Sequence, residues 1–198
     1  MSLGILLSGG MDSAALACWK RPEVAFTINY GQVCAEAEIH AASQICKELT
    51  IEHEIISVDC SSLGSGDLAG LPPDPIAPVP EWWPFRNQLL ITLAAMRAIK
   101  LGIQTLLFGS VKSDLIHVDG RKDFFEKVSE LTSMQEGQLH IVAPAVELTS
   151  VELIKHSGIE RSILAWAHSC HVSNFACGNC RGCYKHQAVM AELGYGAY

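Results

Sequence analysis

Near its start the chain reads Ile5-Leu6-Leu7-Ser8-Gly9-Gly10-Met11-Asp12-Ser13-Ala14-Ala15-Leu16, and this pattern indicates the architecture. Residues 3–7 form an apolar run that is too short for a helix and is typical of a strand buried on both faces. The paired glycines after it allow a sharp turn, because glycine lacks a Cβ and tolerates positive φ. The residues that follow begin a helix. The stretch therefore predicts a strand, a glycine turn and a helix.

The start of that helix is a candidate anion site. Helix N-termini present unpaired N–H groups and the positive end of the dipole, and a glycine turn adds further amides. Gly-Gly alone is also compatible with an ordinary turn. The whole string, Ser-Gly-Gly-x-Asp-Ser after an apolar strand, favours a phosphate site that is neither a Walker loop nor Gly-x-Gly-x-x-Gly. It resembles the PP-loop of ATP pyrophosphatases, which adenylate a substrate oxygen and release pyrophosphate.

Beyond this stretch, strand and helix patterns alternate. Residues 24–30 and 54–58 have strand character, and helical periodicity extends over 33–49 between them. Further strands are expected at 106–110 and 141–144, and further helices at 89–101, 122–134, 150–156 and 159–167. A long loop, residues 61–84, is either a lid or a mobile segment. The order predicts an α/β fold with a doubly wound parallel sheet and ligands at the carboxyl ends of its strands.

The composition is that of a globular protein. Of the 198 residues, 49% are hydrophobic and only 18% are charged. The formal net charge of −7 argues against sequence-independent binding of nucleic acid. No signal peptide precedes the first strand, and no apolar run approaches the length of a membrane span. We therefore expect a cytoplasmic protein with no membrane or nucleic-acid partner.

Four of the eight cysteines crowd into one short segment, as Cys170, Cys177, Cys180 and Cys183. Cys-x2-Cys turns present sulfurs at the spacing that a tetrahedral zinc ion needs, and four cysteine ligands leave no open position for water. Structural Zn²⁺ is favoured. An iron–sulfur cluster would use the same ligands, and a reducing compartment disfavours disulfides. We expect an ATP-binding domain over residues 1–160 and a helical zinc-binding segment over 161–198.

Four features occur along the chain in one order. They are the Ser-Gly-Gly-x-Asp-Ser string, Tyr30-Gly31-Gln32 after the second strand, Pro-x-Arg-Asn at 84–87, and Ser169-Cys170 followed by Cys-x2-Cys-x2-Cys. Together they resemble the 7-cyano-7-deazaguanine synthase family over nearly the whole chain. The resemblance implies an enzyme that uses ATP to activate the carboxylate of 7-carboxy-7-deazaguanine, converts it with ammonia to an amide, and dehydrates the amide to the nitrile. It also implies Mg²⁺, structural Zn²⁺ and a homodimer.

The same resemblance assigns roles to individual residues. The pyrophosphate of ATP would be held by Ser8, Gly9, Gly10, Asp12 and Ser13, with Asp12 also helping to hold Mg²⁺. The rest of the nucleotide site would include Tyr30 and Gln32. Catalytic roles would fall to Asp12, Ser13, Arg86 and Asp114. Deazaguanine binding would involve Arg86, Asn87, Asp114, Asp119 and Arg121. From the residues alone, Asn87 is equally compatible with a helix cap, Arg86 with a solvated cation, and 111–121 with a polar surface loop.

Several positions depart from the family pattern. Phe85 replaces the usual Gly of Pro-Gly-Arg-Asn, Val33-Cys34 replace Arg-His, Ser150 replaces a lysine, and the loop at 116–121 is one residue shorter. The PP-loop and the cysteines are unchanged, so ATP activation is expected to persist while the fate of the activated acid stays open. One alternative is therefore transfer of the acyl group to an amine of a partner protein, as in an antiphage system.

Other features leave further alternatives. Exposed tryptophans in Glu81-Trp82-Trp83-Pro84 would mark a protein interface, unless this loop packs on its own core. An ATP-sensing module without catalysis is opposed by the intact PP-loop. Sulfur insertion into tRNA is opposed by the negative charge and by cysteines committed to metal. His168 and His171 are either surface or pocket residues, with the surface interpretation favoured, and the role of His117 is open.

Overall fold

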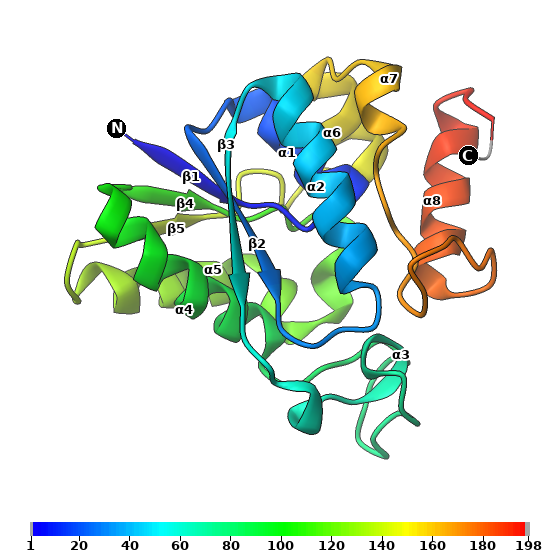
Figure 1. Cartoon of the computed structure of the whole chain (residues 1–198), viewed down its shortest axis with the longest axis horizontal. Helices are drawn as coiled ribbons and strands as arrows, with labels where there is room; N and C mark the ends of the chain where they lie inside the picture. Colours follow the sequence, from blue (N-terminus) through cyan, green and yellow to red (C-terminus); the bar gives the residue numbers. More distant parts are fainter. Residues whose placement is uncertain (1, 197–198) are drawn as a thin grey trace.

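A five-stranded sheet in which every pairing is parallel forms the centre of the computed structural model, which describes residues 2–196 (Figure 1). The strands are β1 (Leu3–Leu6), β2 (Val24–Asn29), β3 (Glu52–Ser57), β4 (Thr105–Leu107) and β5 (His140–Val142). Their spatial order is β3-β2-β1-β4-β5. The strands β2 and β3 lie on one side of β1, and β4 and β5 lie on its other side. The strand order therefore switches between β1 and β4, and doubly wound sheets bind ligands at such a switch point. The predicted α/β fold is confirmed.

Helices cover both faces of the sheet. The longer ones are α1 (Met11–Lys20), α2 (Ala35–Leu49), α4 (Arg86–Ala98), α5 (Lys122–Ser133), α6 (Ser150–Ser157) and α8 (Arg181–Glu192). Short turns of helix are α3 (Gly66–Ala69), α7 (Arg161–Leu164), η1 (Ser61–Leu63), η2 (Ile99–Leu101), η3 (Lys112–Ile116) and η4 (Val118–Gly120). In Figure 1, α1, α2, α6 and α7 lie on one side of the sheet and α4 and α5 on the other.

Two hydrophobic cores result, one on each face of the sheet. Successive residues of a strand point to opposite faces. Ile5 and Leu7 accordingly pack with α1, α2 and α6, whereas Leu6 packs with α4 and α5. This alternation explains why the first strand is apolar at every position. Within residues 2–196, no helix is both long enough and apolar enough to cross a membrane.

The loop at residues 61–84 packs on the protein. Trp83 is 3% exposed, and its ring meets that of Tyr30 edge to face with centroids 4.9 Å apart. The prediction that exposed tryptophans mark an interface is therefore wrong for Trp83, because its side chain packs in the hydrophobic core that also contains residues of α4. The strand expected at 106–110 ends earlier than predicted, at Leu107, and residues 108–110 line a cavity.

Phe85 adopts a strained backbone conformation immediately before α4. Its φ of 55° and ψ of 21° lie in the left-handed region, where a side chain costs roughly 1–2 kcal/mol. The Phe85 side chain is 77% exposed and recovers little of this cost by burial. We expect Phe85→Gly to raise the free energy of unfolding by about 1 kcal/mol relative to Phe85→Ala, which keeps the Cβ. Urea denaturation measures the difference, and equal stabilities would contradict the strain.

Candidate active site

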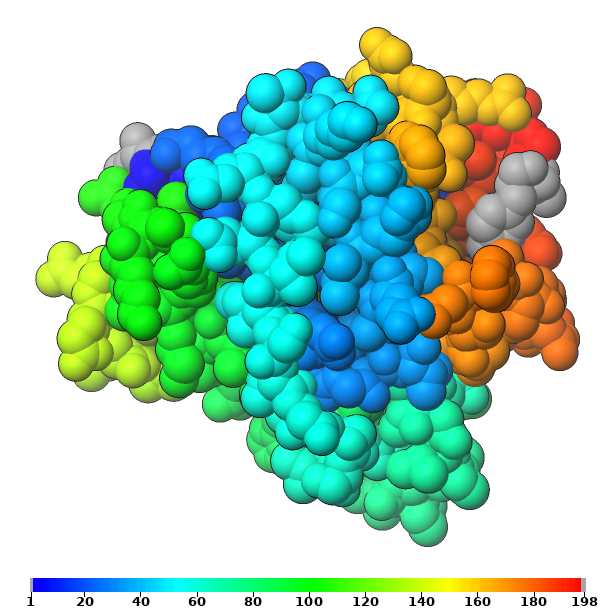
Figure 2. Space-filling model, in the orientation of Figure 1, coloured from blue at the N-terminus to red at the C-terminus, as the bar shows by residue number. Residues whose placement is uncertain are grey.

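A cavity of about 400 Å³ opens at the carboxyl ends of β1 and β4. Its wall is formed by the β1–α1 turn, the loops that precede α4 and α5, and the C-terminal segment from residue 168 into α8. The C-terminal segment also lies against α2, as Figure 2 shows in orange and blue. Asn174 makes this contact, because its Oδ1 accepts from Ala37 N at 3.2 Å and its Nδ2 donates to Glu36 Oε2 at 3.0 Å.

The β1–α1 turn has the geometry of a phosphate site. Gly9 has a φ of 77°, and a Cβ there would lie 2.6 Å from the carbonyl oxygen of Glu38, so this position requires glycine. Gly10 precedes α1, and no described side chain caps it, so the first-turn amides stay open to a ligand. Ser13 Oγ donates to Gly10 O at 2.9 Å and lies 3.3 Å from Ser8 Oγ. Amides and hydroxyls thus converge at one end of the cavity.

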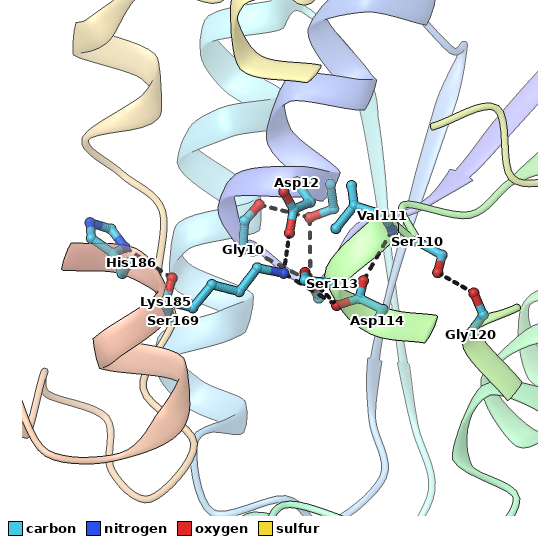
Figure 3. A network of polar contacts seen from close by, with 12 residues as sticks. Gly10, Asp12, Ser110, Val111, Ser113, Asp114, Gly120, Ser169, Lys185 and His186 are labelled. Carbon is cyan, nitrogen blue, oxygen red and sulfur yellow. Dashed lines mark hydrogen bonds and ion pairs between the residues drawn. The ribbon is translucent and has the colours of Figure 1, made fainter. Parts of the chain in front are cut away.

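One lysine joins this turn to the loop after β4 (Figure 3). Lys185 Nζ, from α8, donates to Asp12 Oδ2 at 2.9 Å and to Asp114 Oδ1 at 3.2 Å. Burial opposes the charge of this ammonium, but the two carboxylates outweigh it and raise the pKa of Lys185 above its usual value. Lys185 is therefore charged at neutral pH. The second oxygen of Asp12, Oδ1, is buried and has no partner among the described residues.

Arg86, the first residue of α4, also lines the cavity. Burial lowers its pKa, but Tyr30, Asp119, Glu38 and Asp114 surround the guanidinium and together raise that pKa above its usual value. Burial also raises the pKa of the Tyr30 hydroxyl, so the phenol stays neutral. The cavity wall thus contains a second fixed cation besides Lys185.

The four clustered cysteines fit a single metal ion. Their sulfur atoms lie within 4.8 Å of one another, with Sγ–Sγ distances of 3.9 Å for Cys170–Cys180 and for Cys177–Cys183. A tetrahedral zinc ion with Zn–S bonds of about 2.3 Å requires sulfur separations of about 3.8 Å. Four sulfur atoms this close together enclose enough space for one metal ion but not for a cluster of several metal ions. The site could hold a metal such as zinc.

A family model described as "Queuosine biosynthesis protein QueC" matches residues 3–194. The chain belongs to the QueC family. Similar proteins include the 7-cyano-7-deazaguanine synthase of Nitrosomonas eutropha, which is 31% identical over 94% of this chain and 92% of that protein. The 7-cyano-7-deazaguanine synthase 1 of Desulfitobacterium hafniense is 28% identical over 94% of this chain and 90% of that protein. Membership in a family with these synthases makes the chain an enzyme.

A solved structure shares the fold of this QueC-family chain. NMN synthetase from Francisella tularensis superimposes with a TM-score of 0.51, covering 100% of this chain and 79% of that protein. Sequence identity is 18%, so the likeness extends to the α/β fold alone.

The QueC-family cavity includes most, but not all, of the residues that the sequence assigned to the site. Eight line it, namely Ser8, Gly10, Asp12, Ser13, Tyr30, Arg86, Asn87 and Asp114. Four lie outside its wall, namely Gly9, Gln32, Asp119 and Arg121. Asp119 Oδ2 accepts from Asn87 N at 3.2 Å and its carbonyl accepts from Asn87 Nδ2 at 2.8 Å, which ties the loop to the start of α4. Gln32 Nε2 donates to Glu38 Oε2 at 2.7 Å, and Arg121 Nε donates to Leu115 O at 3.0 Å.

Sequence reasoning missed several polar residues in the wall of this QueC-family site. Among them are Glu81, Arg181 and Lys185. The two basic residues occupy positions i and i+4 of α8 and therefore share one helix face, a spacing that was readable beside the cysteines. Glu81 stands in an irregular loop and had no such signal.

The three histidines whose roles were open line the same cavity. His117, His168 and His171 are all in its wall, so the surface interpretation of the last two is wrong. His168 lies against the protein backbone, with Nε2 at 3.1 Å from the carbonyl oxygens of Cys170 and Ser173. Burial lowers the pKa of His171 to about 4, with the neighbouring cations contributing in the same direction. His171 is therefore neutral at physiological pH.

Proposed function

We propose that this QueC-family enzyme uses ATP to adenylate the carboxylate of 7-carboxy-7-deazaguanine and converts it with ammonia to 7-cyano-7-deazaguanine. One observation carries the proposal. The open N-terminus of α1, with Asp12 in its first turn, and Arg86 line the same cavity. Such a site can bind a nucleotide phosphate and an anionic acid together. The names of the similar synthases support this substrate.

In the first step, a carboxylate oxygen of the substrate bonds to the α-phosphorus of ATP, and pyrophosphate leaves with the electrons of the broken P–O bond. The amides of α1 and the hydroxyls of Ser8 and Ser13 would bind the phosphates. The Lys185 ammonium would stabilise negative charge that develops on the leaving group. Asp12 Oδ1 is a buried carboxylate oxygen without a partner, which is the ligand type that Mg²⁺ prefers. Mg²⁺ bound there would supply further neutralisation of phosphate charge.

In the second step, the lone pair of ammonia attacks the acyl carbon, AMP leaves, and loss of a proton gives the amide. The amide oxygen then bonds to the α-phosphorus of a second ATP, pyrophosphate leaves, and loss of AMP and of protons gives the nitrile. Arg86 would orient the carboxylate before activation, since a guanidinium pairs well with this group.

Mass spectrometry tests the proposal directly. The protein is incubated with 7-carboxy-7-deazaguanine, ATP, Mg²⁺ and ammonium, and the expected product is the nitrile with release of pyrophosphate. An Asp12→Asn variant serves as the matched blank, because it keeps the shape of the side chain and removes its charge. Absence of pyrophosphate release by the wild-type protein would contradict the proposal.

A second candidate is transfer of the activated acyl group to an amine of a partner protein. Exposed apolar side chains on the loops beside the cavity favour it, since Phe85 is 77% exposed and Val118 is 70% exposed. In the same assay this enzyme would release pyrophosphate and yield an acyl adenylate or amide with little nitrile. A homodimer and a cytoplasmic location stay predictions.

A further inference from the structure

Three buried side-chain atoms have no hydrogen-bond partner among residues 2–196, and all three belong to the wall of one cavity. They are Asp12 Oδ1, Glu81 Oε2 and His171 Nδ1. An unpaired buried polar atom is costly, and such atoms are rare in folded proteins. Their concentration here indicates that a bound ligand supplies the partners. The proposed function uses Asp12 at the phosphate end and leaves the other two unexplained.

Glu81 is held in a fixed orientation by the residues around it. It comes from the loop before α4 and is 5% exposed. Its Oε1 lies 3.0 Å from Arg181 Nη1 and 3.6 Å from His117 Nε2. Burial would raise the pKa of Glu81, but the interactions with His117 and with the charge of Arg181 outweigh it and lower that pKa. The side chain is therefore an anion with one oxygen paired to Arg181 and the other buried without a partner among the described residues.

The surroundings of Glu81 select the kind of ligand that Oε2 accepts. A carboxylate oxygen only accepts hydrogen bonds, so the ligand must present a donor. Arg181 already balances the charge of Glu81, and Arg86 and Lys185 line the same cavity. A further cation would be repelled by these three. The complementary ligand is thus a neutral N–H group.

Three further carboxylates in or beside the cavity wall are already engaged. Glu38 accepts from Gln32 Nε2 at 2.7 Å. Asp119 accepts from Asn87 N and lies outside the cavity wall. Asp114 accepts from Lys185 Nζ and from Val111 N. We infer that Glu81 Oε2 accepts a hydrogen bond from a ring N–H or the exocyclic amine of the deazaguanine and thereby selects this heterocycle. The inference rests on the proposed function and adds a specificity-determining residue to it.

Glu81→Gln tests the inference because the amide must keep its oxygen toward Arg181. The NH₂ group of the new side chain then occupies the place of Oε2. It cannot accept the hydrogen bond, so two donors face each other. Isothermal titration calorimetry with a non-hydrolysable ATP analogue present should show binding of 7-carboxy-7-deazaguanine weakened about 10- to 100-fold. The affinity for the ATP analogue should not change. Glu54→Gln is the matched control, since Glu54 pairs with Arg97 at 2.9 Å outside the cavity wall.

Substrate analogues separate recognition from a purely structural ion pair. Three analogues each remove one donor, namely the 2-deamino, N1-methyl and N9-methyl forms of 7-carboxy-7-deazaguanine. One of them should bind the wild-type protein weakly and lose no further affinity in Glu81→Gln. Additive losses for all three would overturn the inference and leave the proposed function intact. Failure of the wild-type protein to bind 7-carboxy-7-deazaguanine, with ATP binding retained, would overturn both.

Discussion

Lys185→Met is expected to lower the rate of ATP-dependent pyrophosphate release about 100- to 1000-fold, the usual effect of removing one preorganised charge from a reacting centre. The ammonium lies 2.9 Å from Asp12 Oδ2 and 3.2 Å from Asp114 Oδ1, at the phosphate end of the cavity. Without it, both carboxylates lose the ammonium that balances their charge beside the triphosphate. The measurement is steady-state pyrophosphate release with 7-carboxy-7-deazaguanine as the acid.

Lys127→Met is the matched control for this experiment. Lys127 pairs with Glu130 at 3.0 Å on the exposed face of α5, and its removal should leave the rate unchanged. Thermal unfolding of both variants separates lost chemistry from lost folding. A Lys185→Met rate within about tenfold of the wild type would show that this ammonium supports the fold rather than the reaction.

Cys180→Ala is expected to abolish metal binding and to lower the free energy of unfolding by about 4 kcal/mol or more, as loss of a structural metal does. Cys180 Sγ is one of the four clustered sulfurs, and it also accepts from the backbone N–H groups of His171 and Cys183. The residue caps α8, which carries both Arg181 and Lys185. Metal analysis of the purified protein and chemical denaturation measure the two effects.

Cys60→Ser provides the comparison, because Cys60 lies outside the cluster. This variant should keep its metal and most of its stability. A Cys180→Ala protein with wild-type metal content would contradict the four-cysteine site.

The parts of the fold that could be read from the sequence are those encoded by contiguous residues. The β1–α1 turn, the parallel sheet and the cysteine cluster each have a local pattern. Gly9 illustrates why, since its positive φ and its close approach to Glu38 O both require glycine at that one position. The sequence therefore displays the requirement directly.

The remainder of the site depends on contacts between distant segments. Lys185 reaches Asp12 across 173 positions of the chain, and no local spacing encodes that distance. Asp119 shows the converse, because its position in the loop predicted a substrate contact while tertiary packing uses it to anchor Asn87. The sequence pattern identified candidate residues in this loop, and tertiary packing determines which of them line the cavity.

The contacts between residues 9–12 and the C-terminal segment that begins at residue 168 have a consequence for synthesis on the ribosome. His168 N donates to Gly9 O at 2.9 Å, and Lys185 completes the charge balance around Asp12. Asp12 is therefore translated 173 positions before the lysine that balances its charge. Products of premature termination upstream of α8 would lack Lys185 and hence the completed site. Such products are therefore expected to lack the proposed activity.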